Sequence, residues 1–534
     1  MAKTQPVKQA NSERRYGLFS LLSLIVGVVI GSGIFVKNQG VIETAGSTTN
    51  ALISWGIVSF IIILMVFAFV EIASSTKLSK KPGTMSHWMG TFVGPRAGKF
   101  IGVFMLYVYF PIIIFALSMW GAEKVLMTSN TQYFTDNPWG LYGGTISLGL
   151  LFLFMVYLTN IWSTKGSKAI GTTGMFLKTI PLFTVIVMAF IALGMGQGQL
   201  PTTNPVDIAP DSSNDFNAII LALPGIMFAF DGFVYSASMQ NEAKTDKTFM
   251  TAWVGGMIFV IAIYITYSFS IMVFVTDGYE FTLVAALKAW LPDNVEIWMI
   301  PLMESIVVIS ILSGLNGQII GSSKSMASLS AENIMPDYRG TYVRLNRTGR
   351  PQFAQYKLLA ITLGWMGLLV SLDAINMATG GAATHMSATN YASDITAVVS
   401  FTAYAVIMLG GMWNRRTGKV EVEKKSYFMA TAAIASAGLL FIAGFQFYNV
   451  LVELFSNADW MPFVVVFLMI AIPGFLMWKF SQTIDGNPET KRRAKALERF
   501  YKVETDPIFK DAPNYFMFTY PKSKDPKYAH LRNK

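Results

Sequence analysis

The stretch Val26 to Phe35 reads VGVVIGSGIF and lies in the first long apolar run of the chain, Tyr16 to Val36. Gly31, Ser32 and Gly33 interrupt this run near its outer third. In hydrocarbon every backbone N–H and C=O needs a partner, so a broken helix is tolerated mainly where it lines a cavity or binds a ligand. The stretch therefore predicts a membrane helix with a binding site at its break.

The composition is that of a membrane protein. Of the 534 residues, 53% are hydrophobic and 13% are charged, whereas soluble domains carry about 25% charged residues. Apolar runs of about 20 residues recur along the whole chain, which predicts an all-α polytopic membrane protein. Cysteine is absent and only three histidines occur, so we expect neither disulfides nor a metal site, and no cofactor. The first run has no small-residue cleavage site, so we expect it to stay in the membrane.

Twelve apolar segments are long enough to be transmembrane helices. They cover about residues 16–37, 50–71, 97–127, 141–161, 171–195, 216–240, 249–275, 296–323, 353–372, 391–413, 427–448 and 460–480. Shorter apolar segments at 86–93 and 281–291 are expected to form an interfacial helix and an interfacial or re-entrant helix, respectively.

The positive charges alternate from loop to loop. Lysine and arginine gather after even-numbered spans and are almost absent after odd-numbered spans, with Lys288 as the exception. Because positive loops stay in the cytoplasm, both termini are predicted to be cytoplasmic, in the plasma (inner) membrane. The net charge of +10 is thus explained by topology, and we expect no nucleic acid partner.

A second break is predicted in span 6, where residues 228–233 read FAFDGF. Spans 1 and 6 are five spans apart, and breaks at corresponding positions of two halves point to an inverted repeat with a binding site at its interface. The repeats would cover about residues 16–195 and 216–413, with two peripheral helices at about 427–480. Taken alone, the glycines are also consistent with simple helix packing.

Several motifs resemble those of the amino acid–polyamine–organocation (APC) superfamily of amino acid permeases. They are GSGIF at 31–35, FAFDGF at 228–233 followed by NEAK at 241–244, KTIP at 178–181, and the segment from Asn316 to Pro336. The resemblance covers about residues 16–480 and implies a transporter domain with a five-plus-five inverted repeat, broken helices 1 and 6, and alternating access. Residues 1–15 and 481–534 would be a cytoplasmic N-terminus and tail. Asp231 departs from the family pattern, in which an apolar or small residue is commoner, and the tail is longer than usual.

A free amino acid carries a carboxylate and an ammonium, and the two breaks offer partners for both. The N–H groups of Ser32, Gly33 and Ile34 can hold the carboxylate at a helix N-terminus, and the carbonyls of Phe228 to Phe230 can accept from the ammonium. The expected substrate-binding set is Val29, Ile30, Gly31, Ser32, Gly33, Ile34, Phe228, Ala229, Phe230, Asp231, Gly232, Asn316 and Gln318.

Three intramembrane charges are candidates for proton coupling, because such charges are costly and usually functional or paired. Lys178, which by resemblance takes the place of a sodium ion in related carriers, is alternatively a lysine that snorkels to the interface. Asp231 can pair with a cationic substrate or carry the coupling proton, or it can be a structural partner for a freed backbone N–H or for Lys178. Glu304 can face the site or lie near the outer interface.

Other candidates keep two interpretations each. Asn316 and Gln318 can face the substrate or link helices by hydrogen bonds. Phe228 and Phe230 can gate the substrate, and Tyr107 and Tyr109 can face it, or all four aromatic side chains can be packing.

The sequence therefore predicts a secondary active transporter of an amino acid or derived amine, working by proton-coupled symport or by substrate/product exchange. Its partners would be the small-molecule substrate, protons and the lipid bilayer. The alternative is an ion channel built on the same broken helices, although channels more often form pores from rings of groups. No nucleophile motif or phosphate loop is evident, so we do not expect an enzyme.

Overall fold

A computed structural model describes most of the chain. It describes residues 17–31, 33–79, 84–129, 131–196, 215–232, 244–274, 283–288, 291–331, 334–337, 341–342, 351–379, 386–456 and 459–485. Ser32 of the expected substrate-binding set lies outside these residues, as do Phe233 and the NEA of the NEAK segment. The expected N-terminal segment 1–15 lies outside them too, with nearly all of the tail.

The described residues form a helical bundle. Its helices are α1 (Leu18–Val29), α2 (Gly33–Ala45), α3 (Thr48–Ser79), α4 (Met85–Phe92), α5 (Pro95–Phe104), the π-helix η1 (Met105–Tyr109), α6 (Phe110–Ser129), α7 (Thr131–Asp136), α8 (Pro138–Trp162), α9 (Thr164–Leu177), α10 (Thr179–Gly194), α11 (Asp215–Phe230), α13 (Asp246–Val273), α14 (Leu283–Lys288), α15 (Asp293–Ala331), α16 (Gln352–Ala378), α17 (Ser387–Thr417), α18 (Phe428–Ser456) and α19 (Met461–Asp485).

The helix lengths show a multi-pass membrane protein. Within the described residues, ten helical segments are long and apolar enough to cross a bilayer. Two shorter apolar helices, Leu18–Gly27 and Phe216–Phe230, coincide with the predicted spans 1 and 6. These two are short because the chain leaves the helical conformation where the sequence predicted a break.

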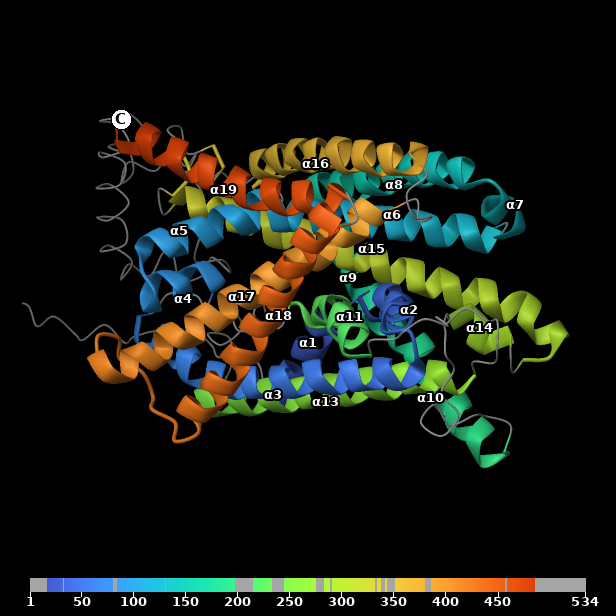
Figure 1. Cartoon of the computed structure of the whole chain (residues 1–534), viewed down its shortest axis with the longest axis horizontal. Helices are drawn as coiled ribbons and strands as arrows, with labels where there is room; N and C mark the ends of the chain where they lie inside the picture. The colour runs from blue at the N-terminus through green and yellow to red at the C-terminus, as the bar shows by residue number, and fades with distance from the viewer. Residues whose placement is uncertain are drawn as a thin grey trace, which may run out of the picture.

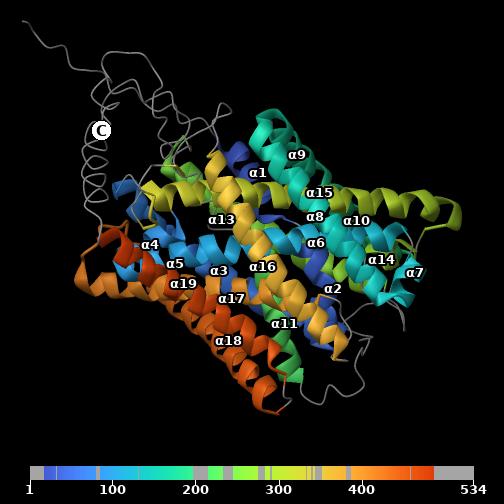
Figure 2. The same ribbon diagram turned by 90° about the horizontal axis from the view of Figure 1, so that it is seen from above.

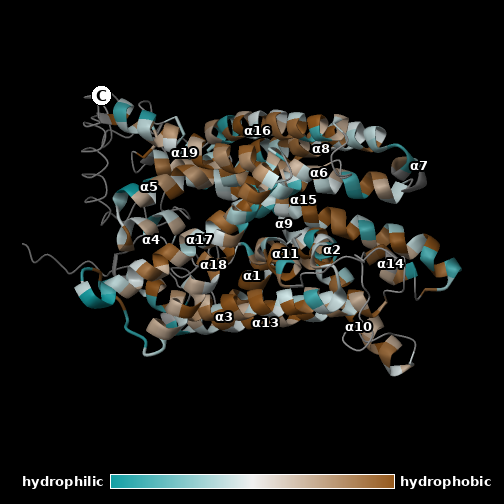
Figure 3. Cartoon of the chain, viewed as in Figure 1, coloured by the Kyte–Doolittle hydropathy of each residue, from teal (hydrophilic) through white to brown (hydrophobic). Residues whose placement is uncertain are grey.

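The two interrupted helices lie at the centre of the bundle. In Figure 1, α1, α2 and α11 lie between the layer of α3 and α13 and the layer that contains α6 and α15. α11 packs against α2 and α3, and α1 packs against α13. Figure 2 shows α18 and α19 along one edge, where they cover α17. Hydrophobic residues run along the helices in Figure 3, and hydrophilic residues gather at ends such as that of α17.

Span 5 differs from its prediction. It begins at Thr164 rather than near residue 171, because the Ser163 side chain accepts a hydrogen bond from the Gly166 N–H at 2.9 Å and caps α9. It is also two helices, α9 and α10, with Lys178 at their junction rather than seven residues into a continuous span. Pro181 explains the junction, since proline lacks the N–H that would bond to the Leu177 carbonyl.

Span 3 contains a π-helix that the sequence analysis did not predict. η1 ends just before Pro111, which lacks the N–H that would bond to the Tyr107 carbonyl. The Trp365 Nε1–H of α16 donates to that carbonyl at 2.7 Å. The freed backbone group is therefore satisfied by a neighbouring helix, as membrane proteins require.

Short helices form where the sequence predicted them. α4 falls on the expected interfacial segment 86–93 and is capped by Thr84, which accepts from the His87 N–H. α14 falls within 281–291. Glu71 lies at the end of α3 that the charge pattern assigns to the cytoplasm. Its carboxylate accepts hydrogen bonds from Arg415 Nε of α17 and from the Lys425 N–H, both at 2.7 Å. Glu71 therefore links α3 to α17 and to the segment that follows it.

Candidate functional site at the two helix breaks

Side chains from other helices hold the first break on the side where α1 ends. α1 ends at Val29, and the carbonyls near its end point beyond the helix. Lys178 Nζ donates to the Gly27 carbonyl at 2.6 Å and to the Ile30 carbonyl, and Tyr264 OH donates to the Val29 carbonyl at 3.1 Å. An ammonium at a helix C-terminus is favoured by the helix dipole. Lys178 and Tyr264 therefore stabilise the C-terminal end of α1.

Lys178 reaches this position from the junction of α9 and α10. The residue is only 7% exposed, and its ammonium contacts α1 rather than snorkelling to the interface. Among the ion pairs of the described residues, none includes Lys178. Among these residues its charge is balanced by carbonyl dipoles and not by a carboxylate.

The second break ends α11 at Phe230. The Asp231 N–H donates to the Phe228 carbonyl at 3.1 Å, and the Gly232 N–H donates to Asp231 Oδ1 at 2.9 Å. Gly232 has a φ of 111°, a conformation that glycine adopts without steric cost. Tyr109 OH donates to Asp231 Oδ2. Asp231 therefore binds a freed backbone N–H and a tyrosine of η1, and not Lys178.

The two breaks lie in direct contact. A Cβ placed on Gly33, the first residue of α2, would lie 2.9 Å from the Ala229 Cα and 3.4 Å from Phe228 Cδ1. Real Cβ atoms do not approach backbone that closely, so any larger side chain at position 33 must push α2 and α11 apart. Residues about 196 positions apart in the chain thus meet at one point, and both belong to the expected substrate-binding set.

Outside this point the structure reveals a buried lysine that the sequence analysis did not weigh. Lys37 lies on α2 one turn after Gly33 and is 7% exposed. Its Nζ lies 2.8 Å from Asp394 Oδ1 and donates to Ser393 Oγ at 2.8 Å, both on α17. It also lies over the rings of Trp120 and Phe228, at 4.9 and 5.3 Å from their centroids.

The contacts of Lys37 join four helices. Trp120 of α6 packs edge-to-face on Phe228 of α11 at 5.6 Å, and its Nε1–H donates to Asn390 Oδ1 of α17 at 2.8 Å. The loop charges predict that this end of α2 faces outwards, so we call Lys37, Asp394, Trp120 and Phe228 the outer clasp. In the sequence, Lys37 ends the predicted span 1 and Asp394 lies near the start of the predicted span 10. These two charges could have indicated the clasp, but sequence spacing does not show that they meet.

Most of the remaining candidate residues are buried or half-buried in the packing between helices. Phe230 packs against Trp55 and Tyr264 at centroid distances of 6.0 and 5.0 Å. Val29, Ile30 and Ile34 are buried, and Gly31 is half-buried. Tyr107 OH donates to the Met335 sulfur at 3.2 Å, so Tyr107 points away from the break that Tyr109 contacts.

Asn316 links helices. Its Oδ1 accepts from Asn160 Nδ2 of α8 and Ser167 Oγ of α9, both at 2.8 Å, and its Nδ2 donates to the Ser167 carbonyl at 3.1 Å. This is the helix-linking arrangement, one of the two interpretations of the sequence. Gln318 is half-buried on the same helix, α15.

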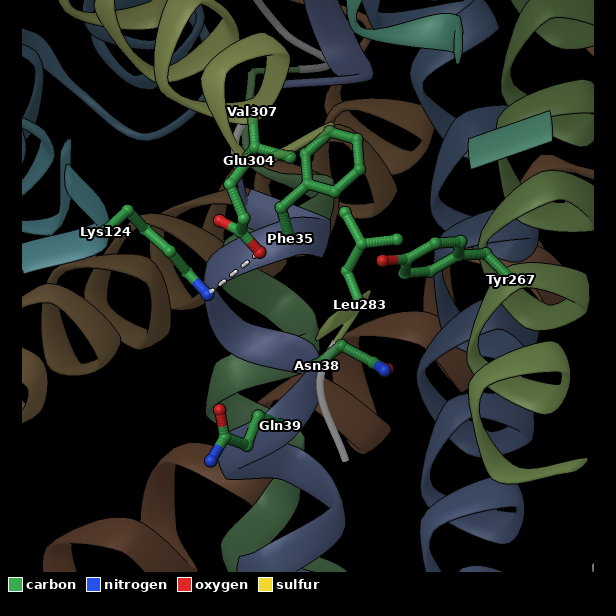
Figure 4. A pocket seen from close by; sticks show the side chains of 8 residues that line it. All are labelled: Phe35, Asn38, Gln39, Lys124, Tyr267, Leu283, Glu304 and Val307. Carbon is green, nitrogen blue, oxygen red and sulfur yellow. Dashed lines mark ion pairs between the residues drawn. The ribbon is translucent and has the colours of Figure 1, made fainter. Parts of the chain in front are cut away.

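Glu304 lies in a small cavity on the outer side of α2, apart from the contact between Gly33 and Ala229. Asn38 and Gln39 of α2, Tyr267 of α13 and Lys124 of α6 also line this cavity, and in Figure 4 the Lys124 side chain approaches the Glu304 carboxylate. Lys124 Nζ lies 3.8 Å from Glu304 Oε1. Within the described residues, no group of three or more His, Asp or Glu side chains is arranged to hold a metal ion.

Comparisons with known proteins agree with this architecture. Residues 16–488 match the amino acid permease family. The chain is 27% identical over 263 residues to the serine/threonine exchanger SteT of Bacillus subtilis, in an alignment that covers 49% of this chain and 55% of SteT. It is 24% identical over 336 residues to the gamma-aminobutyric acid permease of Bacillus subtilis, in an alignment that covers 60% of this chain and 66% of that permease.

A third relative is an antiporter. The arginine/ornithine antiporter ArcD1 of Lactococcus lactis is 24% identical over 373 residues, which is 64% of this chain and 66% of the antiporter. These three alignments span between about half and two thirds of the relatives' lengths. All three relatives are amino acid transporters by name and not enzymes.

Proposed function

The chain belongs to the amino acid permease family of the APC superfamily, and from this we propose that it is a secondary active transporter of an amino acid or derived amine in the plasma membrane. The observation that carries the proposal is the contact between the two breaks, where Gly33 leaves no room for a Cβ against Ala229. A pair of interrupted helices meeting inside a bundle is the arrangement in which carriers bind substrate.

We infer that spans 1–5 and 6–10 form an inverted repeat, covering about residues 16–195 and 216–413 of a transporter domain at 16–480. The helix contacts support it, because the second span of each half packs on the broken span of the other. α3 packs on α11 and α13 packs on α1, and Ser54 Oγ of α3 donates to the Ile219 carbonyl at 3.1 Å. With twelve spans, both termini would be cytoplasmic, as the loop charges indicate.

In this proposal the carboxylate of the substrate binds the N-terminus of α2, at the N–H groups of Gly33 and Ile34. The helix dipole favours an anion there, and glycine lets the ligand approach the backbone. The substrate ammonium would bind carbonyls at the end of α11. Since the Phe228 carbonyl already accepts from Asp231, we expect Ala229 and Phe230 to serve the ammonium.

Lys178 is the best-placed candidate for coupling. It contacts the Gly27 and Ile30 carbonyls directly, so a change in its charge would alter the stability of the end of α1. Asp231 accepts from the Gly232 N–H in the other break and links that break to η1 through Tyr109. Both groups therefore connect protonation to backbone position, which a proton symporter requires.

Uptake into proteoliposomes tests the proposal with a matched pair of glycine variants on α2. Gly33→Val should abolish saturable uptake of labelled amino acid, because its side chain separates α2 from α11. Gly40→Val is the control, since a Cβ there meets nothing within 4 Å, and it should retain uptake. Equal uptake by both variants would exclude a site at the breaks.

The same vesicles distinguish a carrier from the alternative, an ion channel. A carrier shows uptake that saturates with substrate and is accelerated by unlabelled substrate inside the vesicle if it exchanges. Unitary currents without saturable uptake would instead establish a channel and overturn the proposal.

A further inference from the structure

The two tyrosines of η1 reach in different directions. Tyr109 OH donates to Asp231 at the second break. Tyr107 OH donates to the Met335 sulfur at 3.2 Å, just past the end of α15. The loop charges assign this end of α15 to the cytoplasm. The π-helix Met105–Tyr109 therefore contacts both the break and the segment that follows α15.

Polar contacts fix the described part of that segment, residues 334–337 and 341–342. Asp337 accepts from the Thr341 and Tyr342 N–H groups at 2.7 and 2.9 Å. Its carboxylate also accepts from Ser330 Oγ of α15 at 2.7 Å. We call Met335, Asp337 and Tyr342 the latch. Asp337 ties the latch to α15 and gives it a defined position.

A lysine of α16 joins the latch to η1. Lys357 Nζ lies 4.6 Å from the centroid of the Tyr342 ring and 5.6 Å from that of the Tyr107 ring. It also lies 3.7 Å from the Met335 sulfur. Aromatic rings attract a cation placed over their faces. Lys357 therefore stabilises the position in which the latch contacts Tyr107.

The latch belongs to a small apolar cluster that is distinct from the main core of the described residues. Its buried members include Val103, Leu106, Leu329, Met335 and Leu358. Figure 1 shows α19 beside α5, and α19 packs on both α5 and η1. Parts of a protein with few buried apolar contacts open at a lower free energy than the core does. The latch can therefore open while the bundle stays folded.

We propose that η1 couples the second break to the latch, so that loosening one loosens the other. A π-helix is held by i→i+5 hydrogen bonds and occurs frequently at functional sites. Because Tyr107 and Tyr109 lie two residues apart on η1, a change in its winding moves both side chains. Two sites are coupled when both bias the conformation of one such element. This link goes beyond the proposed function, which concerns the substrate and its site at the breaks.

Cysteine labelling tests the link, because the chain has no cysteine of its own. Leu329→Cys introduces a thiol into the apolar cluster, where Leu329 is 6% exposed and its carbonyl accepts from the Met335 N–H at 3.2 Å. In the full-length protein in detergent, this thiol should react with a maleimide more slowly than the thiol of Thr417→Cys, at the exposed end of α17. Equal rates would show that the cluster is open and would overturn the proposal.

Variants at η1 then decide whether the two regions are coupled. In the Leu329→Cys background, Tyr109→Phe removes the contact with Asp231 and leaves the latch contacts in place. It should raise the labelling rate roughly twofold to tenfold, the range for one lost hydrogen bond. Tyr107→Phe breaks the contact with Met335 directly and should raise the rate at least as much. Unchanged labelling in Tyr109→Phe would refute coupling through η1.

Tyr142→Phe is the matched control in the same background. It removes a tyrosine hydroxyl of α8 that donates to the Val370 carbonyl at 2.6 Å, in the half of α16 away from Lys357. It should leave the labelling rate unchanged, and an increase as large as that of Tyr109→Phe would show general loosening and overturn the proposal. Labelling needs no substrate, so its result is independent of the uptake test of the proposed function.

Discussion

Two buried lysines flank the first helix break and differ in what balances their charge. Lys37, on the outer half-helix α2, lies 2.8 Å from the Asp394 carboxylate and over two aromatic rings. Lys178, next to the inner half-helix α1, binds only backbone carbonyls among the described residues. Both are 7% exposed, so burial does not distinguish them. Their partners do.

This difference predicts different roles. Lys37 and Asp394 form an ion pair between α2 and α17, so the loss of either partner leaves the other charge alone. Lys178 has no carboxylate partner among the residues that the structure describes, so its proton can leave without stranding an opposite charge there. We therefore expect Lys37 to set the stability of the contact between α2 and α17, and Lys178 to set coupling.

The largest effect should come from Lys178. Lys178→Met removes the donor to two carbonyls and should lower amino acid uptake by roughly a hundredfold, the cost of misplacing a binding geometry. Lys178→Arg keeps the charge but cannot lose its proton, so it should retain some exchange and lose the response to a pH gradient. Accumulation driven by a pH gradient in Lys178→Arg vesicles would remove Lys178 from coupling.

The next effect concerns the stability of the outer clasp. Lys37→Met leaves Asp394 without its cation, and such changes cost about 3–5 kcal/mol for a fully buried pair. Because the Asp394 side chain is 26% exposed, we expect a smaller loss in the unfolding free energy, measured by denaturant titration in detergent.

Asp394→Asn should rescue Lys37→Met in part, because the double variant has no unpaired charge. Additive losses in the double-mutant cycle would show that the two residues do not interact and would break the comparison with Lys178.

A smaller effect is expected at the second break. Tyr109→Phe removes one donor from Asp231 and leaves the bond from the Gly232 N–H, so it should cost about 1–3 kcal/mol of folding stability. It should also reduce uptake less than Lys178→Met does. A loss of uptake as large as that of Lys178→Met would shift the coupling role to Asp231.

The smallest effect should come from a partly exposed lysine that also has an acidic partner. Lys425 Nζ lies 3.6 Å from Glu423, and their side chains are 35% and 49% exposed. Lys425→Gln removes a pair worth about 1 kcal/mol or less while its backbone N–H bond to Glu71 remains. It gives the baseline against which the two buried lysines are measured in the same unfolding experiment.

Much of the fold followed from local patterns. Hydropathy predicted the bundle of long helices, and the glycines of VGVVIGSGIF and FAFDGF predicted both breaks, because apolar length and backbone freedom are properties of a short stretch. The junction at Lys178 and the π-helix before Pro111 were missed, although each follows a proline rule. A proline inside a membrane helix is often tolerated, because neighbouring groups satisfy the freed carbonyl, so its position alone does not predict a break.

The pairings in the site could not be predicted in the same way. Asp231 had several candidate partners in the sequence, and Tyr109 is its partner because η1 turns that side chain towards the break. Asn316 binds α8 and α9 because α15 packs against both of these helices. The outer clasp and the Glu304 cavity were missed for a related reason, since each combines residues from at least three helices.

The sequence by itself determined that this chain is a multi-pass helical protein of the amino acid permease family with breaks near residues 31–33 and 231–232. These features depend on which residues are adjacent in the chain. Only the tertiary structure decided that Gly33 meets Ala229, that Lys178 holds the end of α1 and that Lys37 pairs with Asp394. Such contacts join residues more than a hundred positions apart, and helix packing, not local sequence, brings them within bonding distance.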